Sequence, residues 1–298
     1  MSGAYVIGVL AAIAAGMAYN LGMVIQKVAV RRIAARARFM QQLIRNRLWL
    51  GGFALQFLVG TPLNLYALAV VGPALLPGLM SSGLVVMAIA AVRLAGESLD
   101  AASTAGIGLV ILAVGLLGFS GLAVDMTAIN LFATDFLMRL TAFTAFFAAL
   151  SLACHLLQSR IEALRGVLRM VDAGLLLAQA NLWVGVLLGF VALWSAGHFA
   201  PSHVLPLALA TAVCAACSVL GTVETQRAFQ VGDAAQLVPI QSVPQQILPL
   251  LSYFVVFRLV PPSSATVPLA AAAAALILAG SGLLARHQAA ASQGLGSA

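Results

Sequence analysis

Residues 221–251 read GTVETQRAFQVGDAAQLVPIQSVPQQILPLL, and this stretch decides the fold. Two long apolar runs flank a turn at Gly232-Asp233, which predicts the end of one membrane helix and the start of the next. The first run carries one acid, Glu224, and the second run carries four glutamines and three prolines: Gln236, Gln241, Gln245, Gln246, Pro239, Pro244 and Pro249. Because carboxylate and amide groups are costly in hydrocarbon, we expect these polar side chains to face the interior of a helix bundle or a water-filled path.

A weaker copy of this stretch lies in the first half of the chain, where residues 60–82 read GTPLNLYALAVVGPALLPGLMSS. One constant shift places Gly60 on Gly221 and Asn20 on Asn181. Several matches at a single offset indicate a duplication of the two halves.

The composition places the chain in lipid, because 62% of its 298 residues are hydrophobic and only 8% are charged. A soluble domain has about 25% charged residues, and so few charges cannot cover a surface that faces water. About twenty apolar residues cross a bilayer as a helix. Nine runs meet this requirement, at 4–28, 48–70, 74–95, 101–121, 131–157, 171–196, 203–231, 234–259 and 266–286. The predicted fold class is all-α, a polytopic membrane helix bundle with about nine transmembrane helices.

The distribution of basic residues predicts the orientation in the membrane. Six arginines lie in the loop after the first run and three more precede the sixth: Arg31, Arg32, Arg36, Arg38, Arg45, Arg47, Arg160, Arg165 and Arg169. The positive-inside rule assigns both loops to the cytoplasm, so we expect an outer N-terminus and a cytoplasmic C-terminus in the cell membrane, plasma or inner. The net charge of +7 is then an orientation signal and an attraction to anionic lipids, and it does not indicate nucleic-acid binding.

The nine crossings divide into two groups of four with one connector between them. The connector, 131–157, inverts whatever follows it, so the two repeats are predicted to have opposite orientations. We expect a first four-helix repeat at 1–122, a linker with the connector helix at 123–160, and a second repeat with a short tail at 161–298. Inverted repeats are a common design of secondary carriers, in which two similar halves open a midplane site to each side in turn.

Glu224 lies on a stripe of small residues in the seventh run. The stripe consists of Ala210, Cys214, Cys217, Gly221, Glu224 and Ala228, at spacings of 4, 3, 4, 3 and 4. Such a stripe is typical of a helix–helix contact face in membranes. Two interpretations are open: Glu224 binds a cation or proton during transport, or it forms a structural pair with Arg227 near the inner surface.

The eighth run contains Pro244 and Pro249, each of which removes a backbone hydrogen bond and bends the helix. Gln241, Gln245 and Ser252 share one face of this run. The pattern fits a broken helix that lines a carrier site. It fits equally a kinked packing helix whose glutamines bond to neighbouring helices.

Most other charged residues are expected to have structural roles. Asp172 lies at the predicted start of the sixth run, where the helix dipole favours an acid, and Lys27 is expected to extend to the inner surface. Asp135 and Arg139, four residues apart, are expected to neutralise each other. The sequence shows no nucleophile–base pair and no metal-ligand cluster, so it predicts no enzyme and no cofactor.

Several motif elements form one pattern in the first half: Tyr66-Ala67-Leu68, Gly72, Ala74, Pro77, Gly96-Glu97-Ser98-Leu99-Asp100, Gly106, Gly108 and Gly115. This pattern resembles the repeat of the drug/metabolite transporter superfamily, of the EamA-like type. The four-one-four arrangement of nine helices is similar to that of the NIPA-type magnesium transporter branch, as is the stretch AFQVGDAAQLVPIQ at 228–241. The resemblance covers nearly the whole chain and implies a secondary transporter, with Mg²⁺ or a metabolite among the solutes it suggests.

These features predict an integral membrane carrier that moves a small polar or cationic solute by alternating access. The predicted binding residues are Asn20, Asn64, Ser81, Asn181, Glu224, Gln241 and Gln245, and Glu224 is also the predicted metal ligand. The alternative is a lipid-binding or lipid-flipping membrane protein, in which the basic cluster at 31–47 holds anionic head groups. The expected partners are the lipid bilayer and the solute, without nucleic acid, and a homodimer is left open.

Overall fold

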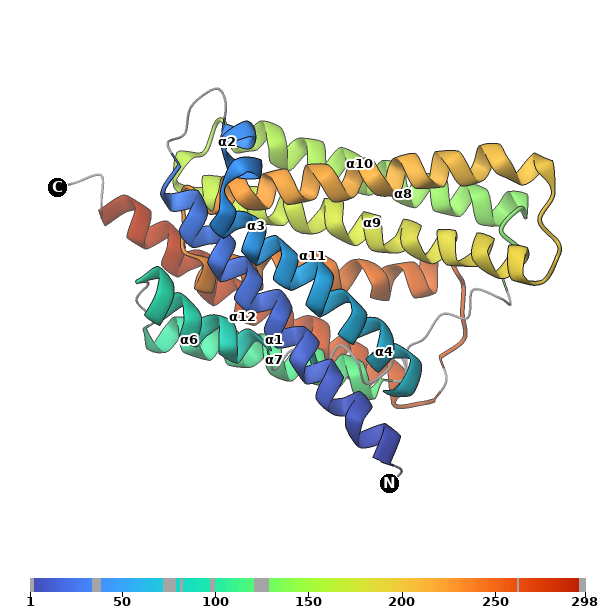
Figure 1. Cartoon of the computed structure of the whole chain (residues 1–298), viewed down its shortest axis with the longest axis horizontal. Helices are drawn as coiled ribbons and strands as arrows, with labels where there is room; N and C mark the ends of the chain where they lie inside the picture. The colour runs from blue at the N-terminus through green and yellow to red at the C-terminus, as the bar shows by residue number, and fades with distance from the viewer. Residues whose placement is uncertain are drawn as a thin grey trace.

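The structure, a computed structural model, describes residues 3–33, 39–71, 79–80, 83–96, 100–120, 129–261 and 263–294. All regular secondary structure in these ranges is helical (Figure 1). The first half contains α1 (Gly3–Arg31), α2 (Phe39–Arg45), α3 (Arg47–Ala54), η1 (Leu55–Gly60), α4 (Thr61–Val71), α6 (Gly83–Ala95) and α7 (Ala101–Phe119). The second half contains α8 (Thr134–Leu157), η3 (Glu162–Leu164), α9 (Arg165–Ser195), η4 (Pro201–His203), α10 (Val204–Ala228), α11 (Ala234–Val255) and α12 (Thr266–Gly294).

Polar side chains cap the start of two helices in the first half. Asn46 caps α3, because its Oδ1 atom accepts hydrogen bonds from the backbone N–H groups of Leu48 and Trp49 at 2.9 and 3.1 Å. Asp100 caps α7 by accepting from the N–H of Ser103 at 2.8 Å. α3, η1 and α4 continue one another, so residues 47–71 form one rod, in which η1 is a π-helical turn.

Five helical segments of the described chain are long and apolar enough to cross a membrane: Val6–Arg31, Arg47–Ala67, Thr134–Leu157, Glu162–Ser195 and Pro201–Ala228. Shorter apolar helices lie at Gly83–Leu94, Ala101–Ala113 and Thr266–Gly280. Large apolar side chains also face outward, and Leu58 and Trp194 are 74% and 70% exposed. An all-helical bundle with an apolar exterior is therefore confirmed, which is the coarser part of the predicted fold class.

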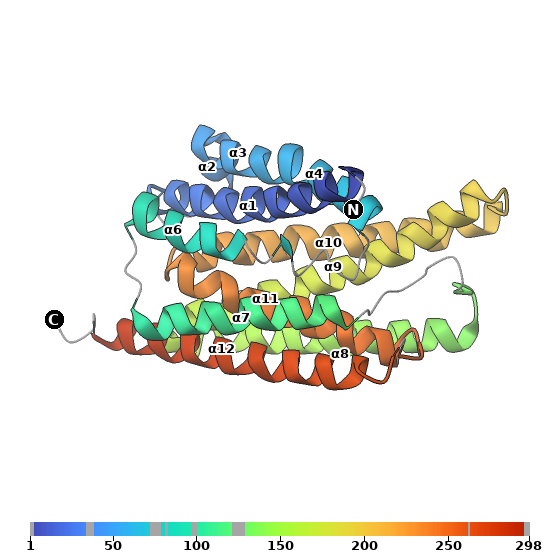
Figure 2. The ribbon, with the colours of Figure 1, turned by 90° about the horizontal axis from the view of Figure 1, so that it is seen from below.

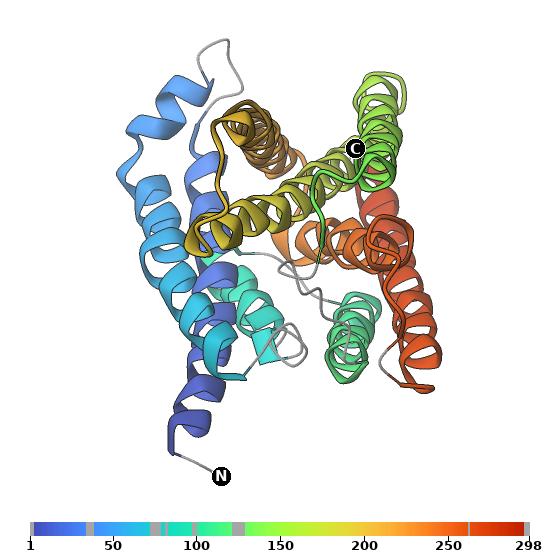
Figure 3. The same cartoon turned by 90° about the vertical axis from the view of Figure 1, so that its right-hand side faces the viewer.

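The helices pack in a similar order in each half. α1 lies against the 47–71 rod and against α6, and α9 lies against α10 and α11. α7 packs along α12 (Figure 2), and α8 packs on α9. Seen along the bundle (Figure 3), α1, α3 and α4 stand on one side, α8 and α12 stand on the other, and α9 and α11 cross between them.

Glycine permits the closest contacts between these helices. A Cβ atom at Gly16 of α1 would overlap the backbone of Met80, and one at Gly83 of α6 would overlap the backbone of Gly16. A Cβ atom at Gly174 of α9 would overlap the carbonyl oxygen of Gln241 in α11. Two helix backbones therefore touch in each half, as small residues allow in membranes, and these contacts bring the polar side chains beside them together.

Candidate functional site

A cavity of about 650 Å³ lies between the two halves of the bundle. Its walls come from α1, η1 and α6 on one side and from α9, α10 and α11 on the other. Four of the predicted binding residues line it, namely Asn20, Asn181, Gln241 and Gln245. Hydroxyl groups come from Tyr19, Ser218, Thr222 and Ser242. Among the described residues that line it, none is charged.

The amide groups in the cavity differ in how firmly the protein holds them. Asn181 and Gln245 make no side-chain hydrogen bond to any residue in the described part of the chain. Asn20 donates from Nδ2 to the carbonyl oxygen of Gly16 at 2.9 Å, and Gln241 donates from Nε2 to the hydroxyl of Thr225 at 2.7 Å. The cavity therefore offers amide donors and acceptors that a polar solute can bind.

Irregular helices border the cavity in each half. The π-helical turn η1 contributes Phe57 to the lining, and π-helical turns are frequent at functional sites. α11 contains Pro239, Pro244 and Pro249, and Pro249 lines the cavity. Both interpretations of α11 have support, because Gln245 faces the cavity while Gln241 also bonds to α10.

A chain of buried amides links the two halves about one turn beyond the cavity. The indole N–H of Trp49 donates to Gln226 at 3.1 Å, and Gln226 donates to Gln26 at 2.6 Å. Gln26 donates to Gln56 at 2.7 Å, and Gln56 donates to the backbone carbonyl of Tyr19 at 2.9 Å. Every amide in this chain both donates and accepts, and a satisfied buried network of this kind rigidifies the contact between the halves.

Lys27 also links the two halves at this end of the bundle, and its position corrects a prediction. The side chain is fully buried and does not extend to the inner surface. Its Nζ atom donates to the carbonyl oxygen of Gly232 and to Asp233 Oδ1, the latter at 3.3 Å. Arg31 donates to the same Asp233 oxygen at 2.6 Å. The predicted turn at Gly232-Asp233 exists, and it is where α1 is tied to the second half.

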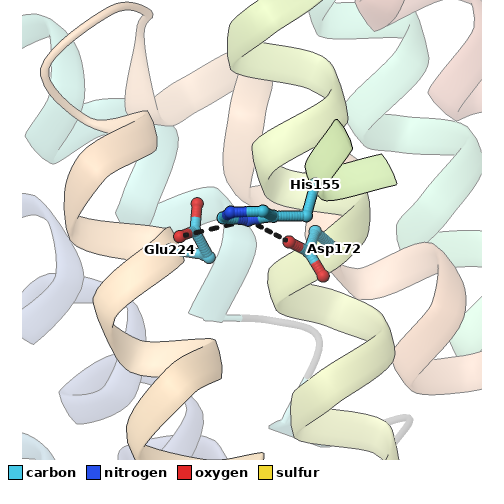
Figure 4. Close-up of side chains that lie close together, drawn as sticks. All are labelled: His155, Asp172 and Glu224. Carbon is cyan, nitrogen blue, oxygen red and sulfur yellow. Dashed lines mark ion pairs between the residues drawn. The ribbon is translucent and has the colours of Figure 1, made fainter. Parts of the chain in front are cut away.

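Glu224 belongs to a second polar region outside the cavity walls, which we name the charged cluster: His155, Asp172 and Glu224. Glu224 Oε1 accepts from Arg227 at 2.8 Å, so the structural pair that the sequence suggested is present. The imidazole of His155 lies between the two acids (Figure 4), with Nδ1 3.8 Å from Glu224 Oε1 and 3.6 Å from Asp172 Oδ2. Glu224 and Asp172 are 5% and 2% exposed, whereas the His155 side chain is 50% exposed.

Neighbouring side chains hold the charged cluster in place. Ser151 of α8 donates its hydroxyl to Asp172 Oδ1. Gln158, just after α8, has its Nε2 atom 2.8 Å from His155 Nδ1. Arg169 of α9 donates to the Oε1 atom of Gln158 at 2.8 Å. Asp172 and His155 are therefore held by Ser151 and Gln158, and Glu224 is held by Arg227 of its own helix.

The helix that carries Asp172 begins earlier than the sequence suggested. α9 starts at Arg165, so Asp172 lies about two turns inside the helix and not at its start. The unpaired N–H groups of the first turn are then not its partners. The hydroxyl of Ser151 supplies the hydrogen bond instead, and the predicted role of Asp172 at a helix terminus is wrong.

Two other predicted binding residues do not line the cavity. Asn64 and Glu224 are not part of the cavity lining, and Ser81 lies outside the described residues. The Oδ1 atom of Asn64 is buried without a hydrogen-bond partner in the described chain. Sequence reasoning missed His155, because the contacts among α8, α9 and α10 that join it to both acids follow no periodicity within one helix.

Comparisons of the chain with protein-family models, curated proteins and solved structures give no match. The resemblance to the drug/metabolite transporter superfamily therefore rests on the sequence motifs alone.

Proposed function

We propose that the protein is a secondary transporter that moves a small polar solute through the cavity between its two halves by alternating access. The observation that carries this proposal is a pair of amides, Asn181 and Gln245, that have no side-chain partner among the described residues and face a space of about 650 Å³ between apolar helices. An amide in such surroundings is costly unless water or a ligand binds it. A scaffold alone gives no reason to keep these groups unpaired.

The lining favours a neutral polar solute over Mg²⁺. Amides and hydroxyls bind a neutral solute by donating and accepting hydrogen bonds. Mg²⁺ is usually bound through one or two carboxylates in an octahedral shell of oxygens, and no described residue of the cavity lining carries a carboxylate. Magnesium transport is therefore the less favoured form of the proposal.

The proposal includes the inverted repeat with its nine crossings. In Figure 1, α1 runs from lower right to upper left, whereas α9 runs from left to right, as opposite orientations require. Asn20 of α1 and Asn181 of α9 coincide under the shift that relates the two halves, and both line the cavity. Two similar halves of opposite orientation can exchange conformations around a central site.

The buried amide chain and Lys27 form the closed gate in this proposal. They lie beyond the cavity at the end of the bundle that carries Arg31 and Arg169, and the positive-inside rule makes this end cytoplasmic. The structure then corresponds to a state that is closed to the cytoplasm. Opening the gate requires the Gln226–Gln26 and Lys27–Asp233 contacts to separate.

Uptake into proteoliposomes tests the proposal. Vesicles with the full chain are incubated with an equimolar mixture of neutral amino acids, polyols and sugars together with Mg²⁺, and their contents are measured by mass spectrometry. We expect at least one neutral polar solute to enter faster than into protein-free vesicles. Gln245→Leu should reduce that uptake, because it removes a free amide from the cavity.

Thr211→Leu is the matched control for Gln245→Leu. Thr211 is exposed on the outside of α10, and its hydroxyl donates to the carbonyl of Leu207 in the same helix at 2.8 Å. Uptake should be unchanged in this variant. Vesicles that accumulate no solute but move labelled lipid between leaflets would instead favour the lipid-flipping alternative.

A further inference from the structure

We propose that the charged cluster binds one divalent transition-metal ion of the zinc type where α8, α9 and α10 meet. His155 lies in the last turn of α8, Asp172 lies in the first part of α9, and Glu224 lies near the end of α10. The site is separate from the cavity. It does not depend on the proposed transport function.

The three side chains present their donor atoms at distances that suit one ion. One ligand atom from each residue lies within 4.8 Å of the others, and His155 Nδ1 is 3.6 and 3.8 Å from the two carboxylates. Two ligands held at about 2.1 Å by one tetrahedral zinc ion are roughly 3.4 Å apart. To hold one tetrahedral ion, the two His155 distances shorten by a few tenths of an ångström, and the two carboxylates, which lie within 4.8 Å of each other, approach by up to about 1.4 Å.

The hydrogen bonds around His155 leave its Nδ1 atom without a proton. Arg169 can only donate, so the amide oxygen of Gln158 faces Arg169 and the amide NH₂ group faces His155. That NH₂ group can also only donate, so Nδ1 accepts and the imidazole proton is on Nε2. The single lone pair of Nδ1 then accepts from the Gln158 amide, with Asp172 and Glu224 3.6 and 3.8 Å away. Three electron-pair donors converge without an imidazole proton between them, and a cation bound there replaces the Gln158 N–H as the partner of Nδ1.

Glu224 has an oxygen that the protein does not use. Oε1 accepts from Arg227, but Oε2 is buried and has no hydrogen-bond partner among the described residues. The residue is 5% exposed, and a buried carboxylate oxygen without a partner is unfavourable. A metal ion that binds the Glu224 carboxylate through both of its oxygens supplies a partner for Oε2, and the half-exposed imidazole of His155 gives the ion a path from the edge of the bundle.

The donor set selects the class of ion. Imidazole nitrogen suits zinc, copper, iron and nickel, whereas Mg²⁺ takes oxygen ligands in octahedral geometry. Three protein ligands with one position left for water form a common kind of zinc site. Two cations lie beside the cluster: Arg227 pairs with Glu224, and Arg169 bonds to Gln158. They reduce its net negative charge, so we expect an ion that exchanges with solution.

Calorimetric titration of the full chain tests the site. The protein is purified in detergent without a polyhistidine tag, stripped of metal with a chelator, and titrated with Zn²⁺ or Mg²⁺. We expect saturable binding of one Zn²⁺ per chain and no binding of Mg²⁺ at the same concentrations. His155→Ala removes a half-exposed ligand without opening the core, and Glu224→Gln keeps the size of the side chain. Each should weaken Zn²⁺ binding at least tenfold.

His198→Ala is the matched control, because His198 is an exposed histidine outside the cluster. Its affinity for Zn²⁺ should stay within twofold of the unchanged chain. Zn²⁺ should raise the unfolding temperature of the unchanged chain and of His198→Ala, but not of His155→Ala. Equal affinity in His155→Ala, or no saturable binding by the unchanged chain, would overturn the proposal. Binding affinity and unfolding temperature are both measured without transport. Their outcome therefore does not depend on whether the protein takes up a solute.

Discussion

The cavity and the charged cluster are two polar regions of one apolar bundle, and they are built differently. The cavity takes its walls from both halves of the chain and is lined by neutral amides and hydroxyls. The charged cluster takes its three residues from α8, α9 and α10 alone, and two of them are buried acids. Hydrogen bonds restrain the acids of the cluster, whereas Asn181 and Gln245 in the cavity have no side-chain partner among the described residues.

The two regions therefore suit different ligands: the cavity suits a solute that passes through, and the charged cluster suits an ion. Neutral amides in a solvated space bind and release a polar solute without a large change in electrostatic energy. Buried carboxylates interact strongly with a cation, because the surrounding dielectric constant is low, and they need partners when the cation is absent. Variants should therefore damage one region and spare the other, unless they alter the helix that serves both.

Gly174→Ala should give the largest effect, because α9 carries both Asp172 and Asn181. The new Cβ atom would overlap the carbonyl oxygen of Gln241 and lie 2.5 Å from Pro244 Cγ. Overpacking a tight contact costs about 1–3 kcal/mol, and we expect the upper end of this range. Thermal unfolding in detergent measures it, and both uptake and Zn²⁺ binding should decline together.

Gly108→Ala is the control for this substitution, since a Cβ atom there meets nothing within 4 Å. Alanine is also the better helix former by up to about 1 kcal/mol, so this variant should keep or slightly raise the stability. Equal stability of the two variants would show that α9 and α11 do not touch as described.

Gln226→Leu should be the next most severe change. It leaves the indole N–H of Trp49 and the Oε1 atom of Gln26 without their partner, and a buried unpaired polar group costs about 1–3 kcal/mol. Gln245→Leu, on the cavity wall, should leave the unfolding temperature nearly unchanged, because that amide bonds to no described residue. If the two leucine variants were equally destabilised, the amide chain could not be the gate that holds the halves together.

Asn181→Leu should separate the two regions most clearly. It removes a cavity amide, so uptake of the transported solute should fall about tenfold, which corresponds to about 1.4 kcal/mol of lost binding. The charged cluster is untouched, so Zn²⁺ affinity should be the same as in the unchanged chain. Parallel uptake and calorimetry on one preparation make the comparison, and a loss of both would argue that the two sites are coupled.

The parts of this arrangement that depend on neighbours along one helix were predictable from sequence. The all-helical class follows from composition, and the Glu224–Arg227 and Asp135–Arg139 pairs follow from spacings of three and four. The repeat offset also placed Asn20 and Asn181 together, and both line the cavity.

The parts that depend on contacts between helices were not predictable. Lys27 bonds to Asp233, and Gln26 bonds to Gln226, across 206 and 200 positions of the chain. The glycine contacts and the helix kinks determine which faces of two helices meet. Hydrophobic periodicity along one helix does not show which faces these are. His155 meets Asp172 and Glu224 for the same reason, so the most specific chemistry of the chain was the least visible in its sequence.

Asp135→Asn should have the smallest effect, and it contrasts a predictable pair with the charged cluster. Asp135 pairs with Arg139 one turn away and lies 3.6 Å from Arg258, but its side chain is 60% exposed. Exposed ion pairs contribute about 0–1 kcal/mol, and Arg139 keeps its hydrogen bond to the carbonyl of Val256 at 2.9 Å. The unfolding temperature should therefore change little, and the remaining difference should vanish at high salt, which screens exposed charges. A large loss of stability would mean that this pair is shielded from water, as the buried acids are. The burial of charge would then no longer distinguish the charged cluster from the rest of the bundle.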